Sequence, residues 1–225
     1  MQRDFSSKRV LVTGGAGFLG QHVSRRFEAL GAQVFSSSSK DFDLTRQDDA
    51  EAMMSAFEPN WVVHCAVDGG GIGYMRRHPA GIVHRNILIN THTLDAAFRS
   101  GAEGFIGVSS ICAYPRNAPM PLREEDLFQG YPEPSNAGYG LTKRIMMEMG
   151  KAYFQEHDFL SLFPMPVNLY GPGDNFSLER SHVVPALIRR FVEAANQGIE
   201  EVEIWGSGKA TRELLYVEDC ADAVV

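Results

Sequence analysis

A tyrosine and a lysine four positions apart, Tyr139 and Lys143, form the pattern Y-x-x-x-K inside a stretch with helical periodicity. This spacing puts both side chains on one face of a helix. Because an ammonium stabilises a nearby phenolate, we expect Lys143 to lower the pKa of Tyr139 from its reference value of about 10. The pair therefore predicts a proton donor for a carbonyl that is being reduced by hydride.

A serine upstream of this pair is expected to share its site. Ser110 ends an apolar stretch, residues 105–110, that we expect to form a buried strand. The carboxyl ends of parallel strands form the ligand crevice of an α/β sheet. Ser110 is therefore predicted to lie at the same crevice as Tyr139 and Lys143.

Residues 13–20, Thr-Gly-Gly-Ala-Gly-Phe-Leu-Gly, contain the pattern G-x-G-x-x-G between an expected strand and an expected helix. Glycines at these places allow a tight turn and let backbone N–H groups approach a pyrophosphate at the positive end of the helix. The strand–turn–helix context is the one that this motif requires. It predicts a dinucleotide cofactor, and the alternative is a glycine-rich turn that holds no ligand.

A run of four serines and a lysine, residues 36–40, follows the second expected strand. NAD enzymes usually place an acidic residue there to hold the ribose 2′-hydroxyl. The run offers hydroxyls and an ammonium and has no carboxylate to repel a 2′-phosphate, which favours NADP although the usual arginine is absent. A solvated serine loop is the alternative. Asp43 and Leu44 come next, at a position where such folds can contact the adenine of the cofactor.

Apolar strands and amphipathic helices must position these residues. The strands are expected at residues 9–13, 33–35, 61–66, 105–110 and 160–169, and the helices at residues 18–30, 48–57, 82–100 and 139–155. Near-continuously apolar strands that alternate with helices predict the α/β class, as a doubly wound parallel sheet of Rossmann type. Residues 68–73 and 115–138 are expected to be loops, and the length of the second indicates a function.

The composition is that of a globular protein. The 225 residues carry a formal net charge of −7 and are 44% hydrophobic and 22% charged, which excludes disordered, collagen-like and coiled-coil chains. No apolar run approaches the roughly 20 residues of a membrane span, and residues 1–9 do not resemble a signal peptide, so no membrane partner is expected. The acidic balance argues against nucleic acid as a partner but leaves room for an anionic small ligand.

The cysteines, Cys65, Cys112 and Cys220, are odd in number and far apart. This pattern argues against a disulfide framework or a metal site and fits a reducing, cytoplasmic compartment. Cys65 is predicted to be structural and Cys220 to be a packing residue. A lone cysteine such as Cys112 is more often a small buried apolar residue, so chemistry there needs the support of its neighbours.

Several further motifs resemble those of extended short-chain dehydrogenase/reductases, and among them those of GDP-L-fucose synthases (GDP-4-keto-6-deoxymannose 3,5-epimerase-4-reductases). The motifs are S-I-C-A-Y-P at 110–115, N-L-Y-G-P at 168–172 with D-N-F at 174–176, S-H-V-V-P-A-L at 181–187, W-G-S-G at 205–208 and R-E at 212–213. The commoner form of the first motif has two serines before the cysteine, whereas here Ile111 fills the slot before Cys112. Matching the motif on its Tyr-Pro end makes Ser110 the functional serine, and a shift of one residue would make it Ser109.

The resemblance implies two sets of catalytic residues. Ser110, Tyr139 and Lys143 would form the reductase triad. Cys112 and His182 would be the acid and base that epimerise C3 and C5 beside the C4 ketone. A thiol and an imidazole both titrate close enough to neutrality to exchange protons. The alternatives are a packing role for Cys112 and a loop-capping role for His182.

The resemblance also implies the residues that hold ligands. The sugar nucleotide would be bound by Arg190, Trp205 and Arg212, with solvated surface charges as the alternative for Arg190 and Arg212. NADP would be bound by Gly14, Gly15, Ala16, Gly17, Phe18, Leu19, Gly20, Lys40, Asp43, Leu44, Ala66, Asn86, Ser109, Lys143, Pro166, Asn168, Leu169 and His182.

The implied function is that of an NADP-dependent epimerase/reductase of a GDP-4-keto-6-deoxy sugar, assembled as a homodimer. The alternatives are a plain nucleotide-sugar epimerase or 4-reductase on a related deoxysugar, and an inactive NADP-binding fragment. Residues 1–170 are expected to form the NADP-binding Rossmann domain and residues 171–225 part of the substrate-binding region. Family members continue beyond the point that matches Val225, so we expect that region to be incomplete here.

Overall fold

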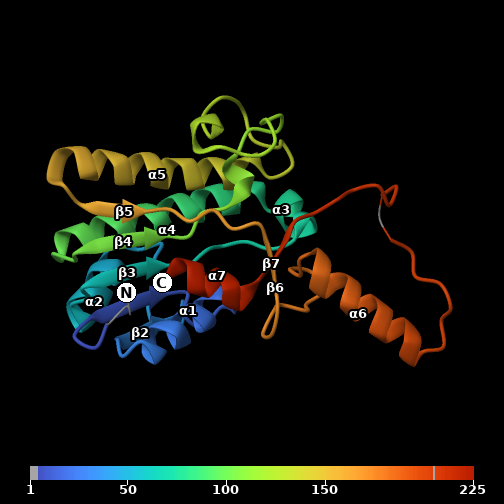
Figure 1. Cartoon of the computed structure of the whole chain (residues 1–225), viewed down its shortest axis with the longest axis horizontal. Coiled ribbons are helices and arrows are strands. Elements are labelled where there is room, and N and C mark those ends of the chain that lie inside the picture. Colours follow the sequence, from blue (N-terminus) through green and yellow to red (C-terminus); the bar gives the residue numbers. More distant parts are fainter. Residues whose placement is uncertain (1–4, 205) are drawn as a thin grey trace.

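The computed structural model describes residues 5–204 and 206–225. Its centre is a five-stranded, all-parallel sheet with the order β2-β1-β3-β4-β5 (Figure 1). The strands are β1 (Arg9–Thr13), β2 (Gln33–Ser37), β3 (Trp61–His64), β4 (Gly104–Gly107) and β5 (Leu160–Leu162). The predicted fold class, a Rossmann-type parallel sheet, is confirmed.

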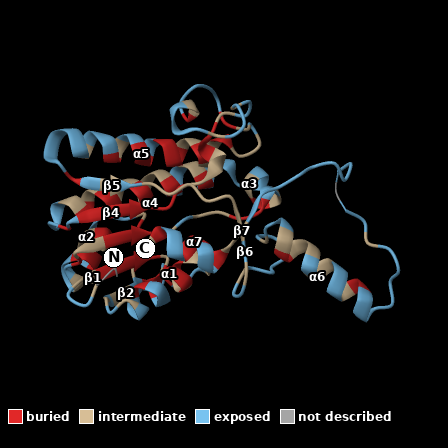
Figure 2. Ribbon diagram, viewed as in Figure 1, coloured by how far each residue is buried: buried red, intermediate tan, exposed pale blue. Residues whose placement is uncertain are grey.

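Helices cover both faces of the sheet because its strands are apolar on both sides. One core joins the sheet to α2 (Gln47–Phe57), α4 (Pro79–Arg99) and α5 (Ala137–His157). A second core joins the other face to α1 (Phe18–Ala29) and α7 (Val217–Val224). Buried residues gather on the strands and on the helix sides that face them (Figure 2).

The order of the strands has a switch point between β1 and β3, which are neighbours in the sheet. From β1 the chain continues to β2 on one side of this pair, and from β3 it continues to β4 on the other side. Connections leave these two strands toward opposite edges, and it is at such a switch point, beyond the carboxyl ends of the strands, that ligands bind to parallel α/β sheets. Thr13 and His64, the last residues of β1 and β3, are paired in register. The glycine turn follows Thr13 directly, which places it at this switch point.

A smaller part lies outside the main sheet. It consists of the two-stranded parallel sheet of β6 (Asn168–Tyr170) and β7 (Leu214–Tyr216), together with α6 (Val183–Asn196). Figure 1 shows α6 extending away from the main sheet. Within the predicted second region, residues 171–225, α7 returns to pack on α1 and the main sheet. The division at residue 170 therefore stays a prediction.

Some element boundaries differ from the sequence-based expectation. The single strand expected at 160–169 is wrong: β5 ends at Leu162 and β6 begins at Asn168, because Pro164 and Pro166 cannot donate to a strand ladder. The third and fourth strands end earlier than expected, at His64 and Gly107.

The two expected loops contain short helices. The first includes only the start of α3 (Ile72–Arg77). The second holds the 3-10 turn η2 (Glu124–Asp126), and a further 3-10 turn, η1 (Ile111–Ala113), just precedes it. Proline and glycine marked these segments as irregular, but turns this short leave no periodic pattern in a sequence.

Candidate active site

The glycine turn is packed too closely for side chains. A Cβ on Gly14, whose φ is +64°, would lie 2.8 Å from the Cα of Ala66, and a Cβ on Gly20 would clash with the carbonyl oxygen of Gly14. Gly17 caps α1 and has no side chain to occupy the free N–H groups of the helix start. The turn thus presents backbone donors at a helix N-terminus, which fits the pyrophosphate of a dinucleotide.

The ribose end of the predicted cofactor site contains a carboxylate that inspection of residues 36–40 missed. Asp41 accepts hydrogen bonds from the N–H and the hydroxyl of Ser38, at 2.9 and 2.7 Å. These bonds hold the pKa of Asp41 below its usual range. Ser36 pairs with Ser24 at 2.7 Å and Ser37 is buried, so Ser39 and Lys40 are the most available members of the run.

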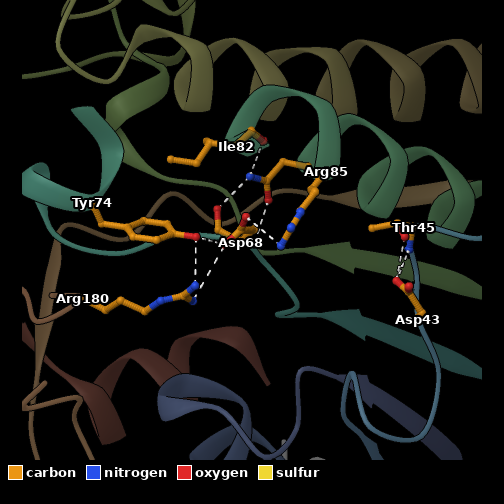
Figure 3. A network of polar contacts seen from close by, with 8 residues as sticks. Asp43, Thr45, Asp68, Tyr74, Ile82, Arg85 and Arg180 are labelled. Atoms are coloured by element: carbon orange, nitrogen blue, oxygen red, sulfur yellow. Dashed lines mark hydrogen bonds and ion pairs between the residues drawn. The ribbon is translucent and has the colours of Figure 1, made fainter. Parts of the chain in front are cut away.

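Asp43 and Leu44 take structural roles in this structure. The Asp43 carboxylate accepts from the N–H and hydroxyl of Thr45, at 3.0 and 2.7 Å, and lowers its pKa by doing so (Figure 3). Leu44 is buried in the core beneath α2, and its carbonyl contacts His92. Their predicted contact with the cofactor stays a prediction.

Tyr139 and Lys143 lie on the first turns of α5, next to the end of β4. The ammonium of Lys143 donates to the carbonyl oxygen of Val108 at 2.7 Å and lies 5.8 Å from the centre of the Tyr139 ring. Burial lowers the pKa of Lys143 to about 8. Burial also raises the pKa of Tyr139, with a smaller upward contribution from Cys112. The expected net lowering of the Tyr139 pKa is therefore wrong for this structure, because desolvation of the phenolate dominates.

The structure distinguishes the two candidate serines. The Ser110 side chain hydrogen-bonds Tyr139 and accepts from the N–H of Cys112 at 3.2 Å. Ser109 is buried, and its hydroxyl has no hydrogen-bond partner among the described residues. Ser110 thus contacts both Tyr139 and the η1 turn, which favours it as the functional serine.

Cys112 lies in η1, in the same cluster. Its sulfur accepts a hydrogen bond from the side-chain amide of Asn136 at 3.2 Å, just before the start of α5. The carbonyl of Cys112 packs so closely on Gly140 that a Cβ there would clash with it. The thiol, the Ser110 hydroxyl and the Tyr139 phenol therefore gather in one place, at the carboxyl end of β4.

Two side chains that the sequence-based search missed hold this cluster together. Arg144 is buried and donates to the carbonyls of Ala113 at 2.6 Å and Gly130 at 2.7 Å, which ties η1 and the long loop to α5. Asn136 carries the contact to Cys112. Neither residue belongs to a recognisable motif, since both act through contacts with residues that are not their neighbours in sequence.

A buried polar chain joins the glycine turn to α5. Burial lowers the pKa of His64 to about 3, so its ring is neutral. The Thr13 hydroxyl donates to Nδ1 of His64 at 2.8 Å, and Nε2 donates to the amide oxygen of Asn90 at 3.1 Å. The Asn90 amide in turn donates to the carbonyl of Thr142 at 3.3 Å. The buried ring of His64 therefore links the glycine turn to α4.

The loop after β3 is fixed by Asn86 and Asp68. The buried Asn86 amide accepts from the N–H of Asp68 at 3.0 Å and donates to the carbonyls of Asp68 and Ile82, both at 2.8 Å (Figure 3). These contacts use every polar atom of the side chain. Asn86 therefore anchors the loop in this structure, and its predicted cofactor contact stays a prediction.

The predicted substrate residues lie on the smaller part of the molecule. His182 is the exposed N-cap of α6, and Arg190, on the same helix, donates to the carbonyl of Glu203. Arg212 is exposed and donates to the carbonyl of its neighbour Thr211 at 2.7 Å. Among the described residues no hydrogen bond or ion pair joins these three to the Ser110–Tyr139 cluster. Trp205 lies outside the described residues.

The other predicted cofactor residues follow the sheet edge. Ala66 lies against Gly14 and donates its N–H to the Thr13 hydroxyl at 3.3 Å. The carbonyl of Pro166 accepts from the N–H of Ile111 at 3.4 Å. In β6, Asn168 donates to the carbonyl of Glu213 at 3.2 Å, while Leu169 packs against the second core. The remaining members, Ala16, Phe18 and Leu19, belong to the glycine turn and the start of α1.

A Rossmann-type sheet with this glycine turn and a Tyr-x-x-x-Lys pair beside a strand-end serine defines the extended short-chain dehydrogenase/reductase class. The chain belongs to the NAD dependent epimerase/dehydratase family, whose model matches residues 10–225.

Known proteins resemble the chain over almost its whole length. It is 42% identical to a rice protein (Oryza sativa subsp. japonica) named "Probable GDP-L-fucose synthase 1", over 96% of this chain and 67% of that protein. It is 38% identical to the GDP-L-fucose synthase of Sinorhizobium fredii, over 97% of this chain and 69% of that protein. A crystal structure of a GDP-L-fucose synthetase from Naegleria fowleri bound to NADP is 30% identical, with a TM-score of 0.86 over 97% of this chain and 72% of that one.

Two other kinds of feature are absent from the part of the chain that the structure describes. No helix in that part of the chain is both long and apolar enough to cross a bilayer. Nor do those residues contain three or more His, Cys, Asp or Glu side chains grouped to bind a metal ion.

Proposed function

We propose that the protein is an NADP-dependent epimerase/reductase of a GDP-4-keto-6-deoxy sugar. The observation that carries this proposal is the gathering of two kinds of proton-transfer group at the end of β4. The phenol of Tyr139 is hydrogen-bonded to Ser110, and the Cys112 thiol lies within the same cluster. A plain reductase needs the first group, and the second suits a proton transfer at carbon. The similarity to GDP-L-fucose synthases supports the choice of substrate.

The chain's own residues provide the cofactor site. The glycine turn, with N–H groups at the start of α1, would bind the pyrophosphate, and Ser39 and Lys40 would meet the ribose 2′-phosphate. When bound, NADPH supplies the hydride for C4 of the sugar. The NADP-bound structure of the Naegleria relative supports this choice of cofactor.

In the reduction step, Tyr139 donates its proton to the C4 oxygen while C4 accepts hydride. The phenol is suited to this because burial keeps it protonated. Ser110, hydrogen-bonded to it, would orient the carbonyl. Lys143, an ammonium below about pH 8, provides the positive charge that stabilises the phenolate left behind.

In the epimerisation step, a base removes the proton from C3 or C5, and the enolate places its charge on the C4 oxygen. An acid on the opposite ring face then returns a proton, which inverts the centre. Cys112 and His182 are the proposed pair. The side-chain amide of Asn136 donates to the sulfur of Cys112 at 3.2 Å and holds it beside Ser110 and Tyr139.

The other members of the assembly are part of the same proposal. Arg190, Trp205 and Arg212 would hold the sugar nucleotide. The protein would act in the cytoplasm as a homodimer, whose interface would use α5, where Ile145 is 47% exposed. Neither a nucleic acid nor a membrane is proposed as a partner.

A panel of GDP-, dTDP- and UDP-linked 4-keto-6-deoxy sugars, each with NADPH and with NADH, tests the proposal. We expect oxidation of NADPH with the GDP-linked sugar, and slower oxidation with NADH. Preference for a dTDP- or UDP-sugar would contradict the substrate class. Equal use of NADH would contradict the cofactor assignment.

A further inference from the structure

Three residues from separate parts of the chain form a compact polar group, which we call the Asp68 clamp: Asp68, Tyr74 and Arg180 (Figure 3). The Tyr74 hydroxyl donates to the Asp68 carboxylate at 2.9 Å and accepts from the Arg180 guanidinium at 2.9 Å. Arg180 lies 3.8 Å from the same carboxylate and 4.3 Å from the centre of the Tyr74 ring. The clamp thus joins the loop after β3 to a segment more than 100 residues later.

The carboxylate at the centre of the clamp is well shielded. The Asp68 side chain is 11% exposed, and Arg85 approaches its second oxygen at 3.7 Å. Its backbone is held on both sides by the Asn86 amide. Burial raises the pKa of Tyr74, so its hydroxyl stays neutral. It can therefore donate to Asp68 and accept from Arg180 at the same time. Arg180 therefore pairs with an acceptor that is fixed to α4 through Asn86.

The backbone beside the clamp is equally close. The N–H of Gly71 donates to the carbonyl of Arg180 at 3.0 Å. A Cβ on Gly71 would clash with the carbonyl oxygen of Ser181, and one on Gly70 would lie 3.3 Å from the Cα of Arg180. Gly70 and Gly71 are therefore the contact surface for residues 180–181.

His182 follows these pinned residues directly and is the N-cap of α6, with its carbonyl accepting from Ala186 at 3.0 Å. We infer that the Asp68 clamp positions His182 for proton transfer at the sugar, with Asp68, Tyr74 and Arg180 as positioning residues. This inference rests on the proposed function, in which His182 is one of the epimerising groups. It assigns a role to Asp68, Tyr74 and Arg180, which the sequence motifs leave without one.

Two variants break the clamp in different ways. Tyr74→Phe removes the shared hydroxyl and keeps the ring beneath the guanidinium, while Arg180→Gln removes the charge. Arg180→Lys restores the charge and serves as the conservative rescue. The matched control is Arg77→Gln, because Arg77 pairs with Glu179 at 3.3 Å across the same two segments but both side chains are more than half exposed. An exposed ion pair of this kind contributes little to the free energy of unfolding.

The experiment incubates each variant with NADPH and GDP-4-keto-6-deoxymannose in deuterated water. It measures deuterium at C3 and C5 of the sugar, NADPH oxidation, NADPH affinity and the thermal midpoint. Misplacing a reacting group by about 1 Å can cost about 10²-fold in rate. We expect Arg180→Gln and Tyr74→Phe to slow incorporation by about 10- to 100-fold. NADPH affinity, the thermal midpoint and the control should stay near parental values, and Arg180→Lys should recover part of the loss.

A His182→Asn variant separates failure of this inference from failure of the proposed function. If His182→Asn incorporates deuterium at the parental rate, the proposed role of His182 is wrong and the inference is wrong with it. If His182→Asn stops incorporation while both clamp variants keep it, the inference alone is overturned. Equal losses of incorporation and of NADPH affinity in the clamp variants would also overturn it, because they would indicate a general structural role.

Discussion

Burial acts on both members of the Tyr139–Lys143 pair. It raises the pKa of the phenol and lowers that of the ammonium to about 8, because each loses solvation of its charged form. At neutral pH the pair is therefore a neutral phenol beside a cation. The proposed proton donor, and a charge that would stabilise its conjugate base, are both present before a substrate binds.

The two proposed chemical steps should be separable by mutation. Tyr139→Phe removes the proton donor for the C4 oxygen and should slow NADPH oxidation by about 10²- to 10⁴-fold, while deuterium still enters C3 and C5. Cys112→Ser replaces the thiol by a hydroxyl that hardly ionises near neutrality, and it should stop the exchange while hydride still reaches the unepimerised ketone. Mass analysis of the sugar and the absorbance of NADPH report the two steps. Parental exchange in Cys112→Ser would make Cys112 a packing residue.

The pH dependence of reduction should have an alkaline limb set by Lys143. Its pKa is lowered from 10.5 to about 8, so the ammonium is lost as the pH rises through 8. We expect kcat/KM for NADPH oxidation to fall there. The unfolded chain keeps this proton up to about 10.5, so the lysine's contribution to the free energy of unfolding should rise between pH 8 and 10.5. A pH–rate profile that stays level from pH 7 to 10 would contradict the assignment.

At the scale of elements, the role of the glycine turn in cofactor binding can be tested by adding one methyl group. Gly20→Ala should force the start of α1 away from Gly14 and reduce NADPH affinity, because the added Cβ clashes with backbone. Gly81→Ala is the matched control, since no atom lies within 4 Å of its Cβ position in α4. It should bind NADPH normally and be at most about 1 kcal/mol more stable. Cofactor fluorescence measures both affinities, and parental binding by Gly20→Ala would show that the turn does not hold the pyrophosphate.

Arg144 should determine the stability of the segment that carries Cys112. Arg144→Met keeps the length of the side chain but loses the donors to Ala113 and Gly130, which should lower the free energy of unfolding by about 2–3 kcal/mol in urea. The control is Arg116→Gln, whose exposed pair with Glu133 belongs to the same loop and should be worth less than about 1 kcal/mol. Equal effects of the two substitutions would mean that Arg144 is not the anchor.

Local patterns predicted the elements that depend on nearby residues. The α5 pair was recognisable from its helical spacing and the buried strands from their apolar runs. The glycine turn was recognisable from the spacing of its glycines between a strand and a helix. The break between β5 and β6 was missed, because the apolar residues around Pro164 and Pro166 continue the hydrophobic pattern of a strand. Turns as short as η1 and η2 were missed because they have no period.

For the whole molecule, the contacts that shape the candidate site come from residues far apart in sequence. Asp68 and Arg180 meet only because the loop after β3 and the segment before α6 pack together. The hydrogen bonds between His64 and Asn90 and between Arg144 and Gly130 also join residues from separate elements, which meet only when the chain folds. Single-sequence patterns carry no information on such pairs, so the motifs predicted the proposed reacting groups and missed the residues that contact them.

The most direct test of the proposed function follows both chemical steps in one reaction. The protein is incubated in deuterated water with NADPH and GDP-4-keto-6-deoxymannose, and the sugar is analysed by mass spectrometry and NMR. We predict a product that carries solvent deuterium at C3 and C5 and a hydrogen from NADPH at C4, with one NADPH oxidised per product. A reduced sugar without deuterium at C3 and C5 would contradict the epimerase assignment, and the absence of NADPH oxidation would contradict the reductase assignment.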